Sequence, residues 1–344
     1  MPEAVTPPGV VTAALESFLR AECPGMVNGP LRVDLLSGGR SNLTYLLTDG
    51  HERWVLRRPP LGHVLATAHD MGREYRLLSA LYPTDVPVPR PLVAAGPGVL
   101  DAPFYIMDFA DGEILRERAR LEAFADRAPA AARSLVEVLV RLHRLDPETV
   151  RLGDLGRPVG YLERQVRRWG RQLAASHSRD LPDLVALGDR LGRALPGKQR
   201  ASIVHGDYRL DNVVIDPDSA SVTGVLDWEM ATLGDPLTDL ASMAIWWDGI
   251  SGLDSPVAAV PGDVPGFPAG EVLVEEYARE TGWDLDEFAW YLGFAYYKVA
   301  VIFEGIHYRA RQGLTVGEGF DRLGGMVPDL VERGHAALDA PGPP

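Results

Sequence analysis

The chain has 344 residues, 46% of them hydrophobic and 24% charged, which is typical of a globular protein with material for a sizeable core. Its net charge of −14 argues against a polyanion such as nucleic acid as the main partner. The single cysteine, Cys23, excludes an internal disulfide and a thiolate metal cluster. No secretory signal is visible, and the longest apolar region, 288–303, is interrupted by Lys298. That region is also shorter than the roughly 20 residues that span a bilayer. We therefore expect a soluble cytoplasmic protein without a membrane segment.

The first 110 residues predict a lead-in followed by an antiparallel sheet. Residues 1–30 are rich in proline around one helical stretch, and we expect them to be loosely held. Short runs of Leu, Val and aromatic residues predict strands at 31–36, 43–48 and 53–58. Asp49-Gly50 between the last two runs is a strong hairpin signal.

A helix and more extended chain follow the third strand. Met71, Tyr75 and Leu78 have helical spacing and predict a helix within 66–81. The proline-rich and apolar runs at 86–96 and 102–109 then predict a return to extended chain.

The remainder of the chain is predicted to be mostly helical. Apolar residues recur every three or four positions in 129–145, 158–176 and 181–195. Strands are expected only at 202–207, 212–216 and 222–228, and the last two of these could form a hairpin. The Gly- and Pro-rich stretch 250–270 predicts a loop, and Asp284 with Glu287 could cap a long apolar helix that begins near Glu287.

The segment HGDYRLDNVV, 205–214, and the segment VLDWE, 225–229, carry the clearest chemical signal. Asp207 and Asn212 lie five residues apart in a loop between two strands, and Asp227 ends the next strand. Two carboxylates and an amide oxygen are hard ligands that suit Mg²⁺. Asp207 could instead accept a proton from an attacking hydroxyl group. The pattern therefore indicates metal-assisted group transfer.

H-G-D-x-x-x-x-N followed by L-D-W-E resembles the aminoglycoside phosphotransferase and choline kinase family, whose members share the protein-kinase-like fold. The resemblance covers roughly 31–313. It implies an α+β, bilobal protein-kinase-like fold. A small antiparallel-sheet N lobe at 31–110 would bind the nucleotide, after the lead-in 1–30. A larger, mainly helical C lobe at 111–344 would hold the catalytic loop and the acceptor site.

Further motifs match the family in the expected order. LSGGRSNLTYLL resembles the loop that covers the nucleotide phosphates, which assigns nucleotide contacts to Gly39, Arg40, Ser41 and Asn42. YIMDFADG resembles the hinge between the lobes, where the Asp108 carbonyl and the Ala110 amide would face adenine. LGDPLTDLA matches a segment in which Asp239 would brace the catalytic loop.

The third strand departs from the family pattern. The family usually has a lysine there that touches the α- and β-phosphates, and this chain has Arg57, with Glu74 matching the helix acid that holds the cation. Arginine keeps the positive charge but is longer and planar. The alternative for Arg57 and Glu74 is a surface ion pair.

The resemblance implies ATP as phosphate donor, with GTP left open, and Mg²⁺ held by Asn212 and Asp227. Asp207 would deprotonate the hydroxyl of a small-molecule acceptor. The runs WVLRRPPLGHVLATAHDMGREYRLLSAL and YYKVAVIFEGIHYRARQG look most similar to kinase domains fused to acyl-CoA dehydrogenases. This branch implies a hydroxyacyl-CoA or related hydroxy acid as acceptor.

Three alternatives stay open. The acceptor could be an aminoglycoside or amino alcohol. The chain could be a catalytically inactive nucleotide-binding scaffold, because Arg57 replaces the lysine. It could also be a metal hydrolase that uses His205, Asp207 and Asp227 and needs no nucleotide. The sequence predicts nothing about the oligomeric state.

Several other polar and aromatic residues have a structural interpretation beside a functional one. We interpret His143 as a buried, hydrogen-bonded residue and His205 as a support of the loop. Trp246 and Trp247 are expected to pack on one face and to rim the acceptor cleft with the other. For the remaining residues, two interpretations stay open: a solvated or paired helix face, or a place at the acceptor. These residues are Arg164, Arg168, Arg171, Lys298, Glu304 and His307.

Overall fold

The computed structural model describes residues 7–37, 42–61, 70–253, 256–257, 259–313 and 322–340. The chain divides into two compact units, Met1–Asp111 with Gly224–Glu229, and Gly112–Thr223 with Met230–Pro344. The first stretch of the first unit ends at Asp111, one residue after the end expected for the N lobe. Two features differ from the expectation: residues 1–30 belong to the first unit, and the short segment Gly224–Glu229 returns to it.

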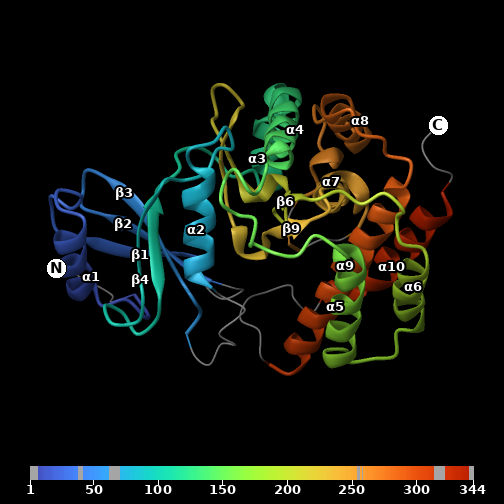
Figure 1. Ribbon diagram of the computed structural model, residues 1–344, viewed down its shortest axis with the longest axis horizontal. Coiled ribbons are helices and arrows are strands. Elements are labelled where there is room, and N and C mark those ends of the chain that lie inside the picture. The colour runs from blue at the N-terminus through green and yellow to red at the C-terminus, as the bar shows by residue number, and fades with distance from the viewer. Residues whose placement is uncertain are drawn as a thin grey trace. The chain divides into compact units, whose positions relative to one another are not determined.

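The first unit is built on a five-stranded antiparallel sheet with the order β1-β2-β3-β5-β4 (Figure 1). Its helices are α1 (Thr12–Glu22) and α2 (Met71–Leu81). Its strands are β1 (Arg32–Ser37), β2 (Leu43–Thr48), β3 (Arg53–Arg58), β4 (Pro91–Ala95) and β5 (Phe104–Asp108). Each strand lies in one of the runs that predicted extended chain, except that β1 continues one residue further, to Ser37.

The two-residue period of the strands gives the sheet two different faces. One face packs with α1 in a single apolar cluster, in which Leu15 and Leu19 of the helix and Leu56 of β3 are fully buried. The described part of the lead-in, residues 7–30, therefore contributes to the core and is not loosely held. On β3 the residue after Leu56 is Arg57, which turns to the opposite face and meets Glu74 of α2.

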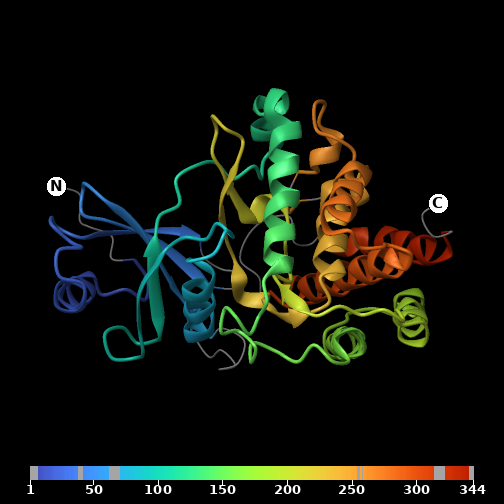
Figure 2. The ribbon, with the colours of Figure 1, turned by 45° about the horizontal axis from the view of Figure 1, so that its top comes forward.

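The second unit is mainly helical. Its helices are α3 (Arg118–Ala123), α4 (Ala128–Arg144), α5 (Tyr161–Ala175), α6 (Pro182–Arg193), α7 (Leu237–Ala244), α8 (Gly270–Thr281), α9 (Phe288–Arg311) and α10 (Leu323–Asp339). Figure 2 shows α4 running beside α8 and the long helices α9 and α10 packed along one another. The short strands are β6 (Ser202–Val204), β7 (Val213–Ile215), β8 (Val222–Val225) and β9 (Thr232–Gly234).

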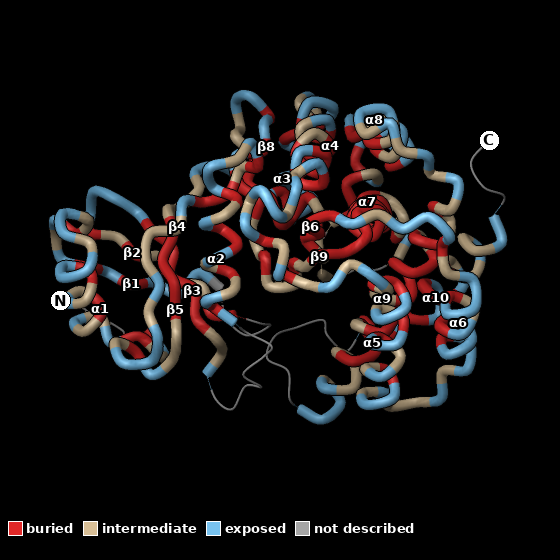
Figure 3. Tube along the Cα trace, viewed as in Figure 1, coloured by how far each residue is buried: buried red, intermediate tan, exposed pale blue. Residues whose placement is uncertain are grey.

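The short strands form two small sheets, and the last two residues of β8, Gly224 and Val225, belong to the first unit. β6 pairs with β9, and β7 pairs with β8, which confirms the expected hairpin. Figure 3 shows that β6, β9 and α7 are almost wholly buried, whereas α5 and α6 expose their outer faces. The loop between β6 and β7 is thus anchored at both ends in the core of the second unit.

The long apolar helix α9 begins at Phe288, close to the expected residue, but the predicted cap is wrong. Glu287 accepts hydrogen bonds from the backbone N–H groups of Gly197, at 2.9 Å, and Lys198, and Asp284 pairs with the Lys198 amine. Both acids therefore hold a neighbouring loop instead of the helix end. Among the described residues, no helix combines the length and the apolar composition needed to cross a membrane.

Candidate active site

The loop between β6 and β7 brings Asp207 and Asn212 together. The Asn212 side-chain N–H₂ donates to the Asp207 backbone carbonyl at 2.8 Å and to its carboxylate Oδ2 at 2.9 Å. A short 3₁₀ turn, Leu210–Asn212, closes the loop and makes this contact possible. Because the amide nitrogen is used in this way, the amide oxygen of Asn212 is the atom left for a further ligand.

Gly206, just before Asp207, is held from both sides. Its φ of +87° is in the left-handed region, and a Cβ there would lie 2.8 Å from the Met230 carbonyl oxygen, so only glycine fits. Its N–H donates to Asp239 Oδ1 at 2.8 Å, and its carbonyl accepts from the Lys298 amine. The peptide groups on either side of Gly206 are thus fixed by the Asp239 carboxylate and the Lys298 ammonium group.

Asp239 braces the loop as the resemblance implied. Its Oδ2 also accepts the backbone N–H of His205 at 2.6 Å and lies 3.3 Å from His143 Nε2. Burial alone would raise the pKa of Asp239, but the hydrogen bond from His143, the nearby imidazoles and the Gly206 N–H hold that pKa below its ordinary value. The carboxylate is therefore ionised and fully engaged beneath the loop.

The two histidines have the structural roles expected for them. His143 is 4% exposed, and its Nδ1 lies 2.7 Å from the hydroxyl of Tyr277. His205 is completely buried, and its Nδ1 accepts the backbone N–H of Asp207 at 3.2 Å.

Two cations lie near Asp207: Arg209, which was not identified from the sequence, and Lys298, for which both a place at the acceptor and a paired structural role were expected. The Arg209 guanidinium lies 3.5 Å from the Asp207 carboxylate and 2.9 Å from Asp211, and it stacks on Trp246 with its central carbon 4.3 Å from a ring centroid. Burial lowers the pKa of Lys298, while Asp207 and Asp239 oppose that shift. For Arg209 the available signal was its place between two acids, Asp207 and Asp211.

Other polar and aromatic residues are structural. Trp247 is 1% exposed and donates from its indole N–H to the Pro268 carbonyl, and together with Trp246 it lines a small cavity beside Arg209 and Asp211. Glu304 is fully buried and pairs with Arg179 at 2.9 Å. The Arg164 guanidinium donates to the carbonyls of Arg157 and Val159, so it is not part of a free cationic face.

The first unit holds a second constellation, centred on Arg57. Its guanidinium lies 3.5 Å from Glu74 and 2.9 Å from Asp227. Glu74 is 3% exposed and also accepts hydrogen bonds from the Tyr105 hydroxyl at 2.9 Å and from the Asn42 amide at 3.0 Å. Arg57, Glu74 and Asn42 therefore form a buried network that extends to the partly exposed Asp227, and the surface ion-pair interpretation of Arg57 is wrong.

The protonation of this network follows from its burial. Burial opposes the charged form of Arg57, but Tyr105, Glu74 and Asp227 outweigh it and raise the pKa of Arg57, so the guanidinium stays charged. Burial raises the pKa of Glu74, with Arg57 acting against that shift. Asp227 has a φ of +65°, a strained conformation for a residue with a side chain, which is a frequent mark of functional positions.

The remaining predicted site residues are placed as follows. Asp108 ends β5, with its N–H bonded to the Arg90 carbonyl at 2.9 Å, and Ala110 follows just outside the sheet. Gly39, Arg40 and Ser41 lie outside the described residues. Within the described ranges, no group of three or more His, Cys, Asp or Glu side chains is arranged to hold a metal ion.

Comparison with known proteins gives consistent relatives. The sequence model of the phosphotransferase enzyme family matches residues 32–291. Acyl-CoA dehydrogenase family member 11 of Rattus norvegicus is 32% identical over 330 residues, which cover 93% of this chain and 42% of that protein. Acyl-CoA dehydrogenase family member 10 of Mus musculus is 31% identical over 325 residues, 93% of this chain and 30% of that protein. The chain thus spans less than half the length of these relatives.

Solved structures give the same fold. A Ralstonia eutropha protein assigned to the aminoglycoside phosphotransferases has a TM-score of 0.80 and 31% identity, covering 96% of this chain and 98% of its own. A macrolide 2′-phosphotransferase from Brachybacterium faecium has a TM-score of 0.59 and 20% identity, covering 97% and 100%. The chain therefore belongs to the phosphotransferase enzyme family and has its protein-kinase-like fold.

Proposed function

We propose that this protein is an ATP- and Mg²⁺-dependent small-molecule kinase that transfers the γ-phosphate to an acceptor hydroxyl, with Asp207 as the base. The observation that carries the proposal is the fixed Asp207 carboxylate. It is held by the Asn212 amide, on a backbone clamped by Asp239 and Lys298. Such rigid support is what a general base needs, because catalysis in this class rests on positioning and charge neutralisation.

Asp207 would accept the proton of the acceptor hydroxyl as the hydroxyl oxygen forms its bond to the γ-phosphorus. The bond from the γ-phosphorus to the bridging oxygen breaks, and the nucleoside diphosphate leaves with that electron pair. The Arg209 guanidinium lies 3.5 Å from the Asp207 carboxylate and pairs with it.

The residues of the first unit fit a nucleotide. Arg57 supplies a buried, permanently charged guanidinium that suits phosphate, and Glu74 orients it. The adenine would lie against the backbone of Asp108 and Ala110. GTP in place of ATP remains open.

The proposed metal ligands fit Mg²⁺ by their chemistry. Asn212 and Asp227 offer hard oxygen atoms. Two protein ligands are enough, because Mg²⁺ usually keeps several waters and also binds phosphate oxygens. When bound, the ion would neutralise charge on the phosphates. Asp227 also accepts a hydrogen bond from Arg57, so its carboxylate would be shared between Arg57 and the ion.

For the acceptor we propose a hydroxyacyl-CoA or related hydroxy acid. The cations Arg209 and Lys298 beside Asp207 support an acidic acceptor, as do the relatives named as acyl-CoA dehydrogenases. An aminoglycoside or amino alcohol is the second candidate, favoured by the similarity to the Ralstonia eutropha protein and by the net charge of −14.

The test is ATP consumption with Mg²⁺ against hydroxyacyl-CoAs, free hydroxy acids and aminoglycosides, with Asp207→Asn as the matched variant. The asparagine keeps the shape and an oxygen for Asn212 but cannot take a proton. We expect acceptor-dependent turnover that falls by about 10²- to 10⁴-fold in the variant, with nucleotide affinity unchanged.

Two results would contradict the proposal. The inactive scaffold would be favoured if the unaltered protein and the Asp207→Asn variant both bind nucleotide but turn over no acceptor. Hydrolysis of a test ester or phosphate without nucleotide would favour the metal hydrolase.

A further inference from the structure

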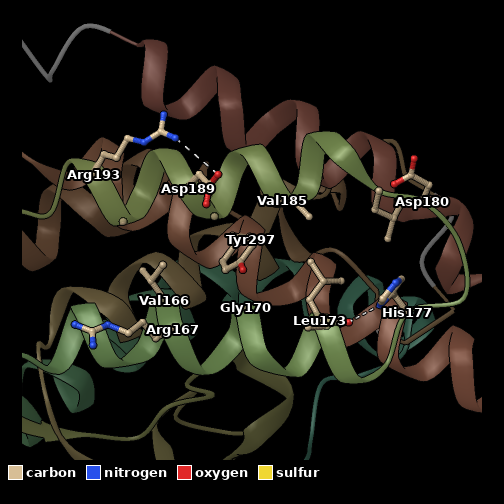
Figure 4. A pocket seen from close by; sticks show the side chains of 14 residues that line it. Val166, Arg167, Gly170, Leu173, His177, Asp180, Val185, Asp189, Arg193 and Tyr297 are labelled. Carbon is tan, nitrogen blue, oxygen red and sulfur yellow. Dashed lines mark hydrogen bonds and ion pairs between the residues drawn. The ribbon is translucent and has the colours of Figure 1, made fainter.

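Two features of the molecule are not used by the proposed phosphate transfer. The first is a cavity of about 630 Å³ between α5, α6 and α9 (Figure 4). Its arginines are paired with acids, Arg167 with Glu163 and Arg193 with Asp189, so the charges around the cavity do not select one kind of ligand. The second is a contact of Glu229 in the first unit, which closes a ring of polar side chains around the candidate phosphate-binding arginine.

The Asn42 amide connects two carboxylates in this ring. Its Nδ2 donates to Glu74 Oε1 at 3.0 Å and to Glu229 Oε2 at 3.2 Å. An amide nitrogen carries two hydrogens, and both are used in these bonds. Asn42 is 6% exposed, so the bonds lie largely out of water and are stronger than they would be on the surface. Asn42 therefore ties Glu74 of α2 to the short segment Gly224–Glu229.

The position of Glu74 decides how the Arg57 guanidinium is held. The contact between them, 3.5 Å from Arg57 Nε to Glu74 Oε2, is an ion pair, and within the described residues Arg57 Nε has no hydrogen-bond acceptor. Glu74 is held by one hydrogen bond on each oxygen, from Asn42 on Oε1 and from the Tyr105 hydroxyl on Oε2. Without the bond on Oε1 the carboxylate could turn about the remaining bond, and the ion pair would no longer fix the guanidinium.

Glu229 closes the ring on the same segment as Asp227. Arg57 Nη2 donates to Asp227 Oδ1 at 2.9 Å, and Asp227 lies two residues before Glu229. Glu229 therefore acts on the guanidinium from two sides. One path runs through Asn42 and Glu74 to Nε, and the other runs through the backbone to Asp227 and Nη2. Both paths depend on the bond between Glu229 and Asn42.

We propose that Glu229 is a positioning residue of the nucleotide site, which fixes the Arg57 guanidinium for binding the nucleotide phosphates. This inference rests on the proposed function, in which Arg57 binds those phosphates. The effect is confined to the phosphates, because the base of the nucleotide would lie against the backbone of Asp108 and Ala110 and not against the ring.

The test is isothermal titration of the full chain with ADP and with adenosine, which has the same base but no phosphates. EDTA is present, so that only the protein acts on the phosphates. Glu229→Ala removes the acceptor for Asn42, and Glu229→Gln keeps an oxygen that can accept the same bond. Asn42→Ala breaks the ring at the same bond and is also combined with Glu229→Ala. Glu22→Ala is the control, because Glu22 is an exposed acid on α1, which packs on the opposite face of the sheet from Arg57.

We expect Glu229→Ala to weaken ADP binding about tenfold, since a hydrogen bond to a charged group is lost, and to leave adenosine binding unchanged. Glu229→Gln should stay within about threefold of the unaltered protein, because the bond to Asn42 can still form. In the Asn42→Ala background, Glu229→Ala should have no further effect, because the two residues act through one bond. Glu22→Ala should bind both ligands normally, and the thermal transition of each variant checks that it is folded.

The proposal is overturned if Glu229→Ala binds ADP like the unaltered protein, or if ADP and adenosine binding weaken equally, which would indicate a general structural role. It is also overturned if Glu229→Gln binds ADP as weakly as Glu229→Ala, or if the Asn42 and Glu229 substitutions add. An unaltered protein that binds neither ligand would contradict the proposed function as well. Failure of this inference alone therefore differs from failure of the proposed function.

Discussion

At the scale of single residues, the candidate base is positioned by buried charges that do not touch it directly. Asp239 accepts two successive backbone N–H groups, those of His205 and Gly206, and is itself fully buried. Hydrogen bonds to a buried carboxylate are stronger than those between neutral groups. The position of Asp207 therefore depends on the ionisation of a neighbour that makes no contact with an acceptor.

Asp239→Asn is expected to lower the free energy of unfolding by roughly 2–3 kcal/mol, because two charge-assisted hydrogen bonds become neutral or are lost. The folded-state pKa of Asp239 lies below its ordinary value of 3.8. A carboxylate with a depressed pKa stabilises the fold above the unfolded-state pKa and loses that effect as the pH falls through the folded-state value. The difference between variant and unaltered protein, measured by urea unfolding, should thus be constant from about pH 5 to 8 and shrink only below about pH 4. A difference that instead grows toward acid pH would contradict this ionisation state.

At the scale of elements, long periodic segments were predictable and short or tertiary features were not. The helices expected at 129–145, 158–176 and 181–195 are present as α4, α5 and α6, each within three residues. Their apolar stripes are long enough to define a period. β9 has three residues, too few to show alternation, and was missed.

The site was predictable only where residues are close in sequence. Asp207 and Asn212 lie in one loop, so their contact follows from the spacing. The partners of Glu287 and Trp247 lie in other segments, at Gly197 and Pro268, and nothing local indicates them. For the same reason the sequence did not show that the Lys298 amine donates to the backbone carbonyl of Gly206, the residue before Asp207.

Helix α9 joins the apolar core to the catalytic loop through that lysine. Lys298→Met is expected to lower kcat about 10- to 100-fold, since a hydrogen bond from a charged group contributes roughly 1.5–3 kcal/mol and the Gly206 carbonyl would lose its donor. The thermal midpoint should stay equal or rise slightly, because a desolvated ammonium is removed. The only other lysine, Lys198, is exposed, and Lys198→Met provides the control. A parallel loss of stability and kcat would show that Lys298 supports the fold in general and not the loop in particular.

At the scale of the whole molecule, neither unit is one continuous piece of chain. The first unit consists of Met1–Asp111 and the six residues Gly224–Glu229, which are inserted in the sequence of the second. This short segment carries Asp227, and it contributes fully buried Val225 and nearly buried Trp228. The Val225 N–H donates to the Pro87 carbonyl at 2.8 Å, and Asp227 pairs with Arg57. A sequence pattern marks strands but not the unit to which a strand returns, which is why the predicted lobes were continuous.

The contribution of this segment can be measured with two versions of the first unit. One version is residues 1–111 alone, and the other has 224–229 appended through a long flexible Gly/Ser linker. Burying Val225 and Trp228 contributes about 1.5–3 kcal/mol for each side chain, so the linked version is expected to unfold in guanidinium with a free energy about 3–6 kcal/mol higher. It should also protect the buried ion pair, because Arg57 and Glu74 keep their Asp227 partner. The control is a linked version with the six residues in scrambled order. If the scrambled segment stabilises residues 1–111 as much as the native order, the assignment of Gly224–Glu229 to this unit is wrong, and the network around Arg57 does not need Asp227 to form.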